Sequence, residues 1–479
     1  MLFKGIGDLI PLYALYALLF ADHGLTTGQI SSLFAIWSTT AFLLEVPSGA
    51  WADTVSRRAL LVFSGVLLTA GFVAWTLVPS YLGFAAGFVL WGVSGALQSG
   101  TFEALLYDEL AAQGQRAAYP RILGYARAAS EAAIVIAIVA ATPLYIWGGY
   151  ALLGWSSVVI AATHTLIGLS LPSAPKAVSA AAVEDLEDDV AEADPPGSPR
   201  QRQYAPGGER STMSTADLDE LERAVAANEL SRPATPVTGR PAAEHRHSTV
   251  SCDAVLVDQA LPEPAVSRPF ARYLTMLRTG VGEAIRVRAV RNGVLLGALL
   301  SGITAFDEYF ALLAESVGVS TAVVPLLVGV TVLGSLIGSM SAGRTEAMAA
   351  RTMAIAVGVA GVLFAGGALI AGLAIGWPNA VYVLAGIGFT AIGVSYGIVY
   401  NAGIVAGARL QDAIEGSARA TVTSVSGLAS EVVALAVFGF AAAAAPWLSM
   451  PVTVALLGAT ILPIALATPS WLPRRRRTD

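Results

Sequence analysis

The chain has 479 residues, of which 55% are hydrophobic and only 13% are charged, and its formal net charge is −6. Its mean hydropathy is +0.66. This composition excludes an ordinary soluble enzyme and is typical of a membrane protein that crosses the bilayer many times. The single cysteine, Cys252, excludes a disulfide framework within the chain and a thiolate metal cluster.

Twelve apolar runs follow one another along the chain, six before a long polar gap and six after it. They fall near residues 5–21, 30–52, 59–78, 82–107, 122–142, 149–171, 292–314, 320–342, 352–374, 379–406, 420–441 and 447–468. Each is close to the ~20 residues that a helix needs to cross a bilayer. We therefore expect an all-α membrane protein with twelve transmembrane helices in two six-helix bundles.

Positive charge is confined to one side of this predicted topology. If the N-terminus is cytoplasmic, the basic residues of the inner loops are Lys4, Arg57, Arg58, Arg116, Arg121, Arg344, Arg351, Arg409, Arg419 and those at 474–477, whereas the opposite loops contain none. Insertion that is biased by Lys and Arg produces this segregation. The sequence thus predicts a multi-pass protein of the plasma (inner) membrane with both termini cytoplasmic. The first run has no convincing cleavage site, so we expect it to be the first span.

The stretch at 173–282 differs from the rest because Pro, Ser, Asp, Glu and Arg dominate it. We expect a largely disordered cytoplasmic linker between an N-terminal bundle at 1–172 and a C-terminal bundle at 283–470, which a basic tail at 471–479 follows. Apolar residues recur at helical spacing over 269–290, with arginines between them. This pattern predicts either an amphipathic helix on an anionic leaflet or a solvated lead-in to the seventh span.

A short motif separates the second and third runs. After Glu45, the residues Gly49, Asp53, Arg57 and Arg58 form Gly-x-x-x-Asp-x-x-x-Arg-Arg. This pattern resembles the loop between helices two and three of the major facilitator superfamily, although Thr54 and Ser56 stand where the family usually has a basic residue and a glycine. The alternative is an ordinary short loop that obeys the positive-inside rule.

The fourth run ends in Ser99-Gly100, Glu103-Ala104-Leu105 and Tyr107-Asp108. This segment is similar to the fourth helix of a bacterial subgroup of the same superfamily. The resemblance implies a cytoplasmic gate in which Asp53 docks at the N-terminus of the eleventh helix, near 416–419, and Arg57 or Arg58 pairs with Asp108. Tyr107 shares a helix face with Glu103.

Acidic residues inside apolar runs are costly in a bilayer, so each is a candidate functional site. They are Glu45, Glu103, Glu131, Asp307, Glu308 and Glu431. The tripeptide Ala-Ser-Glu ends at Glu131 in the fifth run and at Glu431 in the eleventh, which indicates either equivalent positions of two repeats or chance in alanine-rich helices. We expect Glu103, Glu131 and Glu431 to bind protons or substrate. Asp307 and Glu308 are candidates too, although they face an external vestibule in an alternative interpretation.

Aromatic residues in the spans favour a cavity for amphipathic or ring-bearing solutes, or else they serve only in packing. They are Tyr13, Tyr16, Trp37, Trp91, Tyr107, Phe306, Tyr309, Tyr396 and Tyr400. Asn401 in the tenth run is a further candidate for the cavity wall.

The resemblance implies a secondary transporter of the major facilitator type that works by alternating access. Proton-coupled export of a small amphipathic compound, as by an antiporter, is the leading hypothesis. The segment 90–95 lacks the basic residue typical of the drug/proton antiporter branch, so uptake of a sugar or organic acid and a non-transporting sensor or scaffold stay open.

An intramembrane serine protease built on Ser94 and His164 is disfavoured, because twelve spans in two similar halves are foreign to that class. The sequence predicts no enzyme, cofactor, metal site or nucleic-acid partner. We expect a monomer whose partners are a small-molecule substrate, protons and the lipid bilayer.

Overall fold

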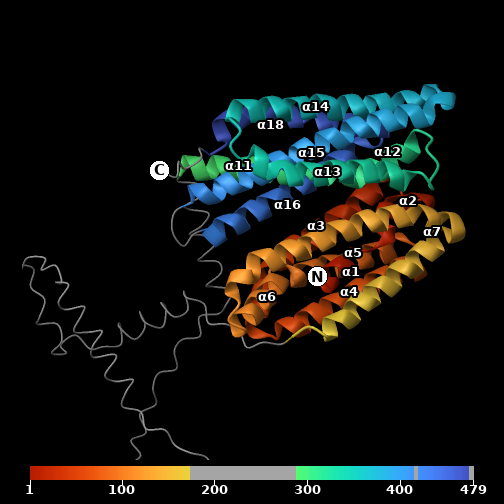
Figure 1. Ribbon diagram of the computed structural model, residues 1–479. Coiled ribbons are helices and arrows are strands. Elements are labelled where there is room, and N and C mark those ends of the chain that lie inside the picture. The colour runs from red at the N-terminus through yellow and green to blue at the C-terminus, as the bar shows by residue number, and fades with distance from the viewer. Residues whose placement is uncertain (173–286, 415–418, 474–479) are drawn as a thin grey trace, which may run out of the picture. The chain divides into compact units, whose positions relative to one another are not determined.

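The computed structural model describes residues 1–172, 287–414 and 419–473, and every element in these ranges is a helix (Figure 1). The predicted linker at 173–282 and most of the predicted amphipathic segment at 269–290 lie outside the described residues, as does most of the basic tail. All the described helices belong to one compact unit.

The first half of the chain folds into helices that account for six crossings. In chain order they are α1 (Leu2–Gly7), the 3₁₀ helix η1 (Pro11–Ala14), α2 (Tyr16–Asp22), α3 (Thr27–Thr54), α4 (Arg57–Leu77), α5 (Tyr81–Gln98), α6 (Thr101–Ala112), η2 (Arg116–Ala118) and α7 (Tyr119–Leu169). Three of these helices begin at a side-chain cap, because Thr26, Ser56 and Ser80 each accept a hydrogen bond from a backbone N–H of the first turn.

Glycines bend the crossings of this half at points that the apolar pattern does not reveal. Gly100, with φ of 70°, separates α5 from α6 within the fourth crossing. Gly149, with φ of 58°, makes a kink in α7 that joins the fifth and sixth crossings. Both values lie in the left-handed region, which glycine adopts without the clash of a Cβ atom. The first crossing is the broken series α1, η1 and α2.

The second half supplies six further crossings. Its elements are α11 (Arg288–Gly302), η4 (Ile303–Tyr309), α12 (Phe310–Ser316), α13 (Val324–Thr345), α14 (Ala350–Gly372), η5 (Leu373–Gly376), η6 (Pro378–Ala380), α15 (Val381–Ala413), α16 (Arg419–Ala444), α17 (Met450–Ala459) and α18 (Ile461–Trp471). The seventh crossing runs through α11, η4 and α12, and the twelfth through α17 and α18.

The described helices account for the predicted twelve crossings. Nine stretches among the described residues are long and apolar enough to span a membrane, and one of them, 116–169, contains two crossings joined by the kink. The broken series α1 to α2 and the long helix α3 supply the other two. The fold class predicted from the sequence is confirmed.

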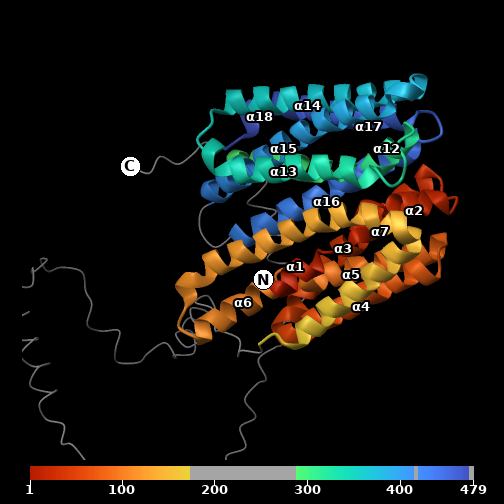
Figure 2. The same ribbon diagram turned by 45° about the vertical axis from the view of Figure 1, so that its right-hand side comes forward.

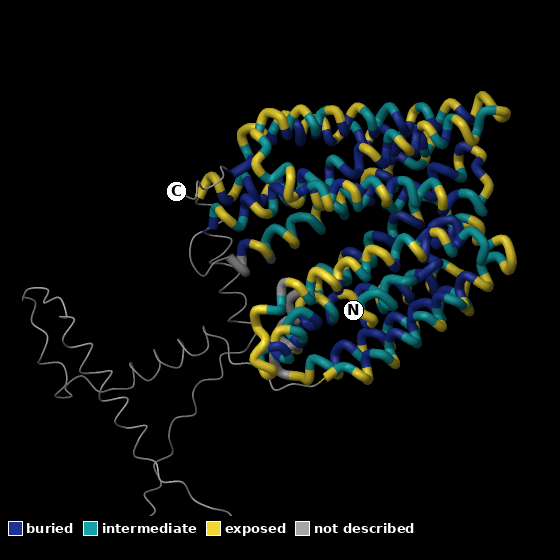
Figure 3. The backbone as a smooth tube through the Cα atoms, in the orientation of Figure 1, coloured by how far each residue is buried: buried dark blue, intermediate teal, exposed yellow. Residues whose placement is uncertain are grey.

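The two halves meet through a small set of helices. Contacts between the halves join α3 to α16 and α7 to α13, and Figures 1 and 2 show the helices of the two halves as two groups that lie one above the other. The short helices α2 and α12 also contact each other at one end of the molecule, which we call the α2/α12 end. Buried residues concentrate where helices face one another, whereas exposed residues follow the outer side of α14 at the top of Figure 3. Such outward apolar faces are what lipid covers in a bilayer.

Candidate functional site

A cavity of about 280 Å³ lies between the two halves, and both halves line it. The first half contributes the aromatic side chains Tyr13, Tyr16, Trp37 and Trp91. The second half contributes Asp307, Glu308, Phe310 and Tyr396, among others. We call this space the central cavity. Sites for drug-sized ligands are typically apolar hollows of ~300 Å³ or more with a few placed polar groups, so the central cavity, which is slightly smaller, suits a small solute.

Two neighbouring carboxylates reach the central cavity from η4. This 3₁₀ segment interrupts the seventh crossing between α11 and α12. Its tighter winding changes the directions of successive side chains from those in a regular α-helix. The Tyr396 hydroxyl donates a hydrogen bond of 2.5 Å to Asp307 Oδ2. The Tyr16 hydroxyl donates to Glu308 Oε2 and thereby links the first half to the second. Both acids therefore line the space between the halves, and each accepts a hydrogen bond from a tyrosine.

Further side chains join the halves near the α2/α12 end. Ser31 of α3 and Tyr309 of η4 share a hydrogen bond of 2.8 Å. The ring of Phe34 packs against Tyr309 with its centroid at 5.8 Å and against Phe438 at 5.5 Å. Since Ser31, Tyr309 and Phe34 are all buried, these contacts close this end of the space between the halves in the described conformation.

Three aromatic rings in the wall of the central cavity form one stack. Trp91 lies between two rings, with centroid distances of 4.9 Å to Tyr13 and 5.1 Å to Trp37 and interplanar angles of 8° and 29°. Offset stacks of this kind present a flat π face, which attracts cations and other rings. Of the aromatic candidates, five line the central cavity: Tyr13, Tyr16, Trp37, Trp91 and Tyr396.

A second and more polar cavity of about 350 Å³ lies within the first half. Its charged or titratable lining residues are Lys4, Asp8, Glu103 and His164. Tyr13 and Trp91 line both cavities, so the two spaces adjoin at this pair of rings. We call the second space the side cavity.

Most polar groups of the side cavity already have partners. Asp8 accepts a hydrogen bond from Ser130, and the Lys4 amine lies 5.0 Å from the centroid of the Phe102 ring. His164 Nδ1 lies 2.9 Å from the carbonyl oxygen of Phe3, but its buried Nε2 has no hydrogen-bond partner among the described residues. Asp8 is not among the site residues predicted above, although it lies inside the first apolar run and the cost of a buried acid applies to it equally.

The three glutamates favoured by the sequence lie in three different places. Glu103 lines the side cavity. Glu431 of α16 accepts a hydrogen bond from Ser38 of α3 and so forms another link between the halves. Glu131 is exposed on α7 and lines none of the described cavities. The acids that line the central cavity are instead Asp307 and Glu308, which the sequence pattern favours less strongly.

Tyr107 and Asn401 do not reach the central cavity. The Tyr107 side chain is 40% exposed, and its ring contacts that of Tyr119 at a centroid distance of 5.6 Å. Asn401 connects α15 to α13 by donating to Ser341 Oγ at 2.9 Å, while it accepts from Thr345 Oγ1 at 2.9 Å. The amide of Asn401 therefore serves helix packing.

The predicted gate is only partly within the described residues. Arg57 at the start of α4 forms an ion pair with Asp108 of α6, whose side chain is 5% exposed. Arg58 instead donates to the backbone carbonyl of Leu169 at the end of α7. The side chains of Glu45, Gly49 and Asp53, and the docking position at 416–419, lie outside the part of the chain that the structure describes.

The rejected protease pair has structural partners. The buried Ser94 hydroxyl donates to the carbonyl oxygen of Ser64 at 2.8 Å, and His164 contacts the backbone of Phe3. These contacts connect α5 to α4 and α7 to α1. They give the Ser94 hydroxyl and His164 Nδ1 structural partners, and neither contact joins Ser94 to His164.

Comparison with known proteins gives one family. The sequence profile described as Major Facilitator Superfamily matches residues 2–430. No curated protein matches the chain. Among solved structures, a nucleoside transporter, NupG, is similar with a TM-score of 0.60, 11% identity and coverage of 99% of each chain.

Two further structures are similar at comparable levels. A D-xylose-proton symporter has a TM-score of 0.54 and 14% identity, and the match covers 98% of this chain and 95% of that one. A POT family transporter in complex with a thioalcohol-conjugated peptide has a TM-score of 0.55 and 12% identity, with coverage of 97% and 93%. At these identities the likeness shows the fold.

Proposed function

Because this chain belongs to the Major Facilitator Superfamily, it is a membrane transporter and not an enzyme, and we propose that it couples proton movement to the passage of a small amphipathic solute through the central cavity. In this proposal the cavity opens alternately to the two sides of the membrane as the halves rock on each other. Glu308 and Asp307 are the principal proton sites.

The observation that carries the proposal is the hydrogen bond between Tyr16 and Glu308 across the central cavity. A hydrogen bond to an ionised carboxylate is roughly twice as strong as one between neutral groups. Protonation of Glu308 therefore weakens a link between the two halves, and loss of the proton strengthens it. Protonation of Glu308 thereby changes the strength of the Tyr16–Glu308 contact, which must break and form again during alternating access.

The other acids take secondary roles in the proposal. Glu431, which Ser38 contacts across the halves, is a second site where a proton weakens a link between them. Glu103 lines the side cavity, which shares the rings of Tyr13 and Trp91 with the central cavity. Glu131 is the weakest candidate because it is exposed on α7. The ion pair of Arg57 with Asp108 supports the gate that Gly49, Asp53 and Arg58 complete, with Glu45 at its start.

The chemistry of the central cavity favours a ring-bearing cation as substrate. Two carboxylates and a stack of three aromatic rings face the same space. A cation on an aromatic face gains about 0.5–2 kcal/mol, and a carboxylate adds charge complementarity. Since the entry of a cation and the loss of a proton from Glu308 balance in charge, exchange of the two, and hence export, is the leading form of coupling.

Uptake of a polar solute is the second candidate. The side cavity favours it, because Lys4, Asp8, Gln98 and Glu103 offer both donors and acceptors to a hydroxylated or zwitterionic molecule. One of the similar structures is described as a D-xylose-proton symporter. The two candidates differ in direction, since export exchanges solute for protons and uptake carries both together.

Reconstitution into vesicles separates these candidates. Purified protein in proteoliposomes is tested with a fluorescent aromatic cation, ethidium, and with radiolabelled D-xylose, under pH gradients of either sign. For exchange we expect ethidium to accumulate in the compartment that is more acidic, and for symport we expect D-xylose to accumulate in the more alkaline one. Movement of neither, together with no heat stabilisation by any member of a panel of cations, sugars, nucleosides and peptides, would favour the sensor or scaffold.

A further inference from the structure

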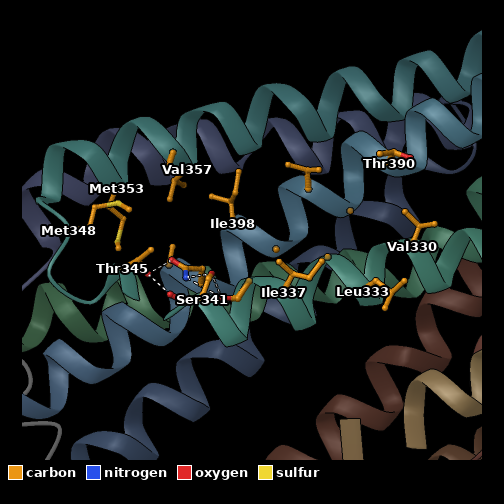
Figure 4. Close-up of a pocket in the computed structure, with 18 residues that line it drawn as sticks. Val330, Leu333, Ile337, Ser341, Thr345, Met348, Met353, Val357, Thr390 and Ile398 are labelled. Carbon is orange, nitrogen blue, oxygen red and sulfur yellow. Dashed lines mark hydrogen bonds between the residues drawn. The ribbon is translucent and has the colours of Figure 1, made fainter. Parts of the chain in front are cut away.

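A large groove of about 510 Å³ lies outside the central cavity, within the second half of the molecule (Figure 4). The helices α13 and α14 form its walls, and α15 lies between them at its floor. Its lining residues differ from those of both cavities described above. We call it the outer groove.

The outer groove opens toward the bilayer. Three of its apolar lining residues are strongly exposed in the absence of lipid, with Leu333 at 46%, Ile337 at 67% and Val394 at 51%. Most of the lining is aliphatic, so water would find few hydrogen-bond partners along it. In a membrane, hydrocarbon must therefore fill this space.

The depth of the groove follows from glycines at its floor. A Cβ on Gly334 would lie 2.0 Å from the carbonyl oxygen of Gly393, and one on Gly338 would lie 2.0 Å from that of Gly397. The backbones of α13 and α15 are thus in direct contact. Because glycine has no side chain, these positions leave a hollow between α13 and α14.

The length of the groove fits one lipid chain. Its lining on α15 extends from Thr390 to Ala402, which is about 18 Å at ~1.5 Å per residue. One leaflet of a bilayer contributes about half of the ~30 Å hydrocarbon core. An acyl chain of one leaflet therefore spans the groove from end to end.

One end of the groove is polar, and several hydrogen bonds connect its residues. Asn401 links Ser341 and Thr345 by hydrogen bonds of 2.9 Å each. Beyond them, Arg409 Nη2 donates to the carbonyl oxygens of Glu346 and Met348 at 2.6 Å each, which fixes the connection from α13 to α14. This connection lies at the end of the groove where α13 ends, at Thr345.

Two arginines flank that connection. Arg344 precedes Thr345, and Arg351 precedes the groove residue Met353 by two positions. Both are exposed, and neither forms a salt bridge with a residue that the structure describes. The same connection contains one acid, Glu346, so its charge is net positive. An apolar groove that ends beside a net positive charge at the membrane surface is complementary to an anionic amphiphile.

We propose that the outer groove binds one acyl chain of an anionic phospholipid, whose phosphate lies near Arg344 and Arg351. The site is separate from the solute pathway, but α15 belongs to both. Ile398 of α15 lines the groove, whereas Tyr396 reaches Asp307 in the central cavity. A lipid chain in the groove therefore contacts α15, the helix that also carries Tyr396 of the central cavity.

Native mass spectrometry of the full chain in detergent tests the site, with phosphatidylglycerol and phosphatidylcholine of equal chain length as probes. We expect phosphatidylglycerol to bind at least tenfold more tightly. Ile337→Trp should fill the groove and remove that binding, whereas Ile355→Trp, at a position that is 69% exposed on α14 and outside the groove lining, should leave it unchanged.

Charge variants keep the test independent of folding. Arg344→Gln combined with Arg351→Gln should lower affinity for phosphatidylglycerol about tenfold and leave that for phosphatidylcholine unchanged. The proposal is wrong if both lipids bind equally to the native chain, or if Ile355→Trp abolishes binding as Ile337→Trp does. Displacement of phosphatidylglycerol by a transported solute would also overturn it, because the groove would then belong to the solute pathway.

Discussion

At the scale of single residues, the central cavity contains two acids, and each accepts a hydrogen bond from a tyrosine. Asp307 and Glu308 are adjacent in sequence, yet their partners come from different halves of the molecule. Tyr396 of the second half contacts Asp307, and Tyr16 of the first half contacts Glu308. One acid is therefore bound within its own half and the other across the halves. This difference gives Asp307 a structural part and Glu308 a coupling part in the proposed mechanism.

Tyr396→Phe tests the structural part. The substitution leaves Asp307 without its hydroxyl donor in a buried position, which costs about 1–3 kcal/mol. We expect a lower midpoint of thermal unfolding in detergent. Tyr382→Phe is the matched control, because Tyr382 is 59% exposed and its bond to Ser320 is long at 3.4 Å. Equal loss in both variants would show that Tyr396 contributes only its ring.

At the scale of elements, glycines determine how closely the helices of the second half approach. Gly397 of α15 faces the backbone of α13, where an added Cβ would lie 2.4 Å from the carbonyl oxygen of Gly334. Gly407, ten residues later in the same helix, has no such neighbour within 4 Å. Alanine substitutions at the two positions therefore separate the effect of helix packing from that of helix propensity.

Gly397→Ala should therefore destabilise the fold, and Gly407→Ala should not. Forcing α13 and α15 apart costs about 1–3 kcal/mol, whereas alanine in an open helical position gains about 0.5–1 kcal/mol. Chemical unfolding in mild detergent, followed by circular dichroism, measures both changes. If Gly397→Ala is as stable as the native chain, the backbone contact does not limit the helix spacing.

The sequence predicted elements far better than it predicted contacts. The twelve crossings followed from apolar length alone, because a bilayer imposes that length on every helix. The break at Gly100 and the kink at Gly149 were not predicted, since a glycine in an apolar run has the same hydropathy whether its φ is negative or positive. Patterns of hydropathy report burial in lipid but carry little information on backbone direction.

The candidate site was predicted in composition but not in arrangement. The sequence identifies Asp307 and Glu308 as acids in a span, but it does not distinguish a functional from a structural role for them, and it leaves open that they face an external vestibule. Their place beside Tyr16 and Trp91 depends on contacts between positions about two hundred residues or more apart, which local periodicity does not encode. Asn401 was assigned to the cavity for its polarity, whereas its three hydrogen bonds hold α15 to α13.

At the scale of the whole molecule, closure of the α2/α12 end is a property of contacts between the halves. Tyr16, Ser31 and Ser38 of the first half each bind a partner in the second. Alternating access requires these bonds to break when this end opens. The neutral bond between Ser31 and Tyr309 is worth about 1 kcal/mol, so the balance between the two states responds to its loss.

Ser31→Ala should shift that balance toward opening at the α2/α12 end, while Ser32→Ala should not, because Ser32 bonds to Tyr81 within its own half at 2.9 Å. The reporter is a cysteine at Thr331, a buried residue of the central cavity, in a Cys252→Ser background. An impermeant thiol reagent applied from that side should label it about fivefold faster in Ser31→Ala. Identical rates in the two variants would exclude Ser31 from the closure.

The most direct measurement of the coupling proposal is transport by Glu308→Gln in proteoliposomes, with Glu315→Gln as control, since Glu315 lies at the end of α12 outside the central cavity. Glutamine keeps the size of Glu308 and an acceptor for Tyr16 but cannot exchange a proton at neutral pH. The account predicts that Glu308→Gln still exchanges solute between equal compartments but no longer accumulates it under a pH gradient, whereas Glu315→Gln does both. Accumulation by Glu308→Gln at the native level would contradict the assignment of Glu308 as the coupling site.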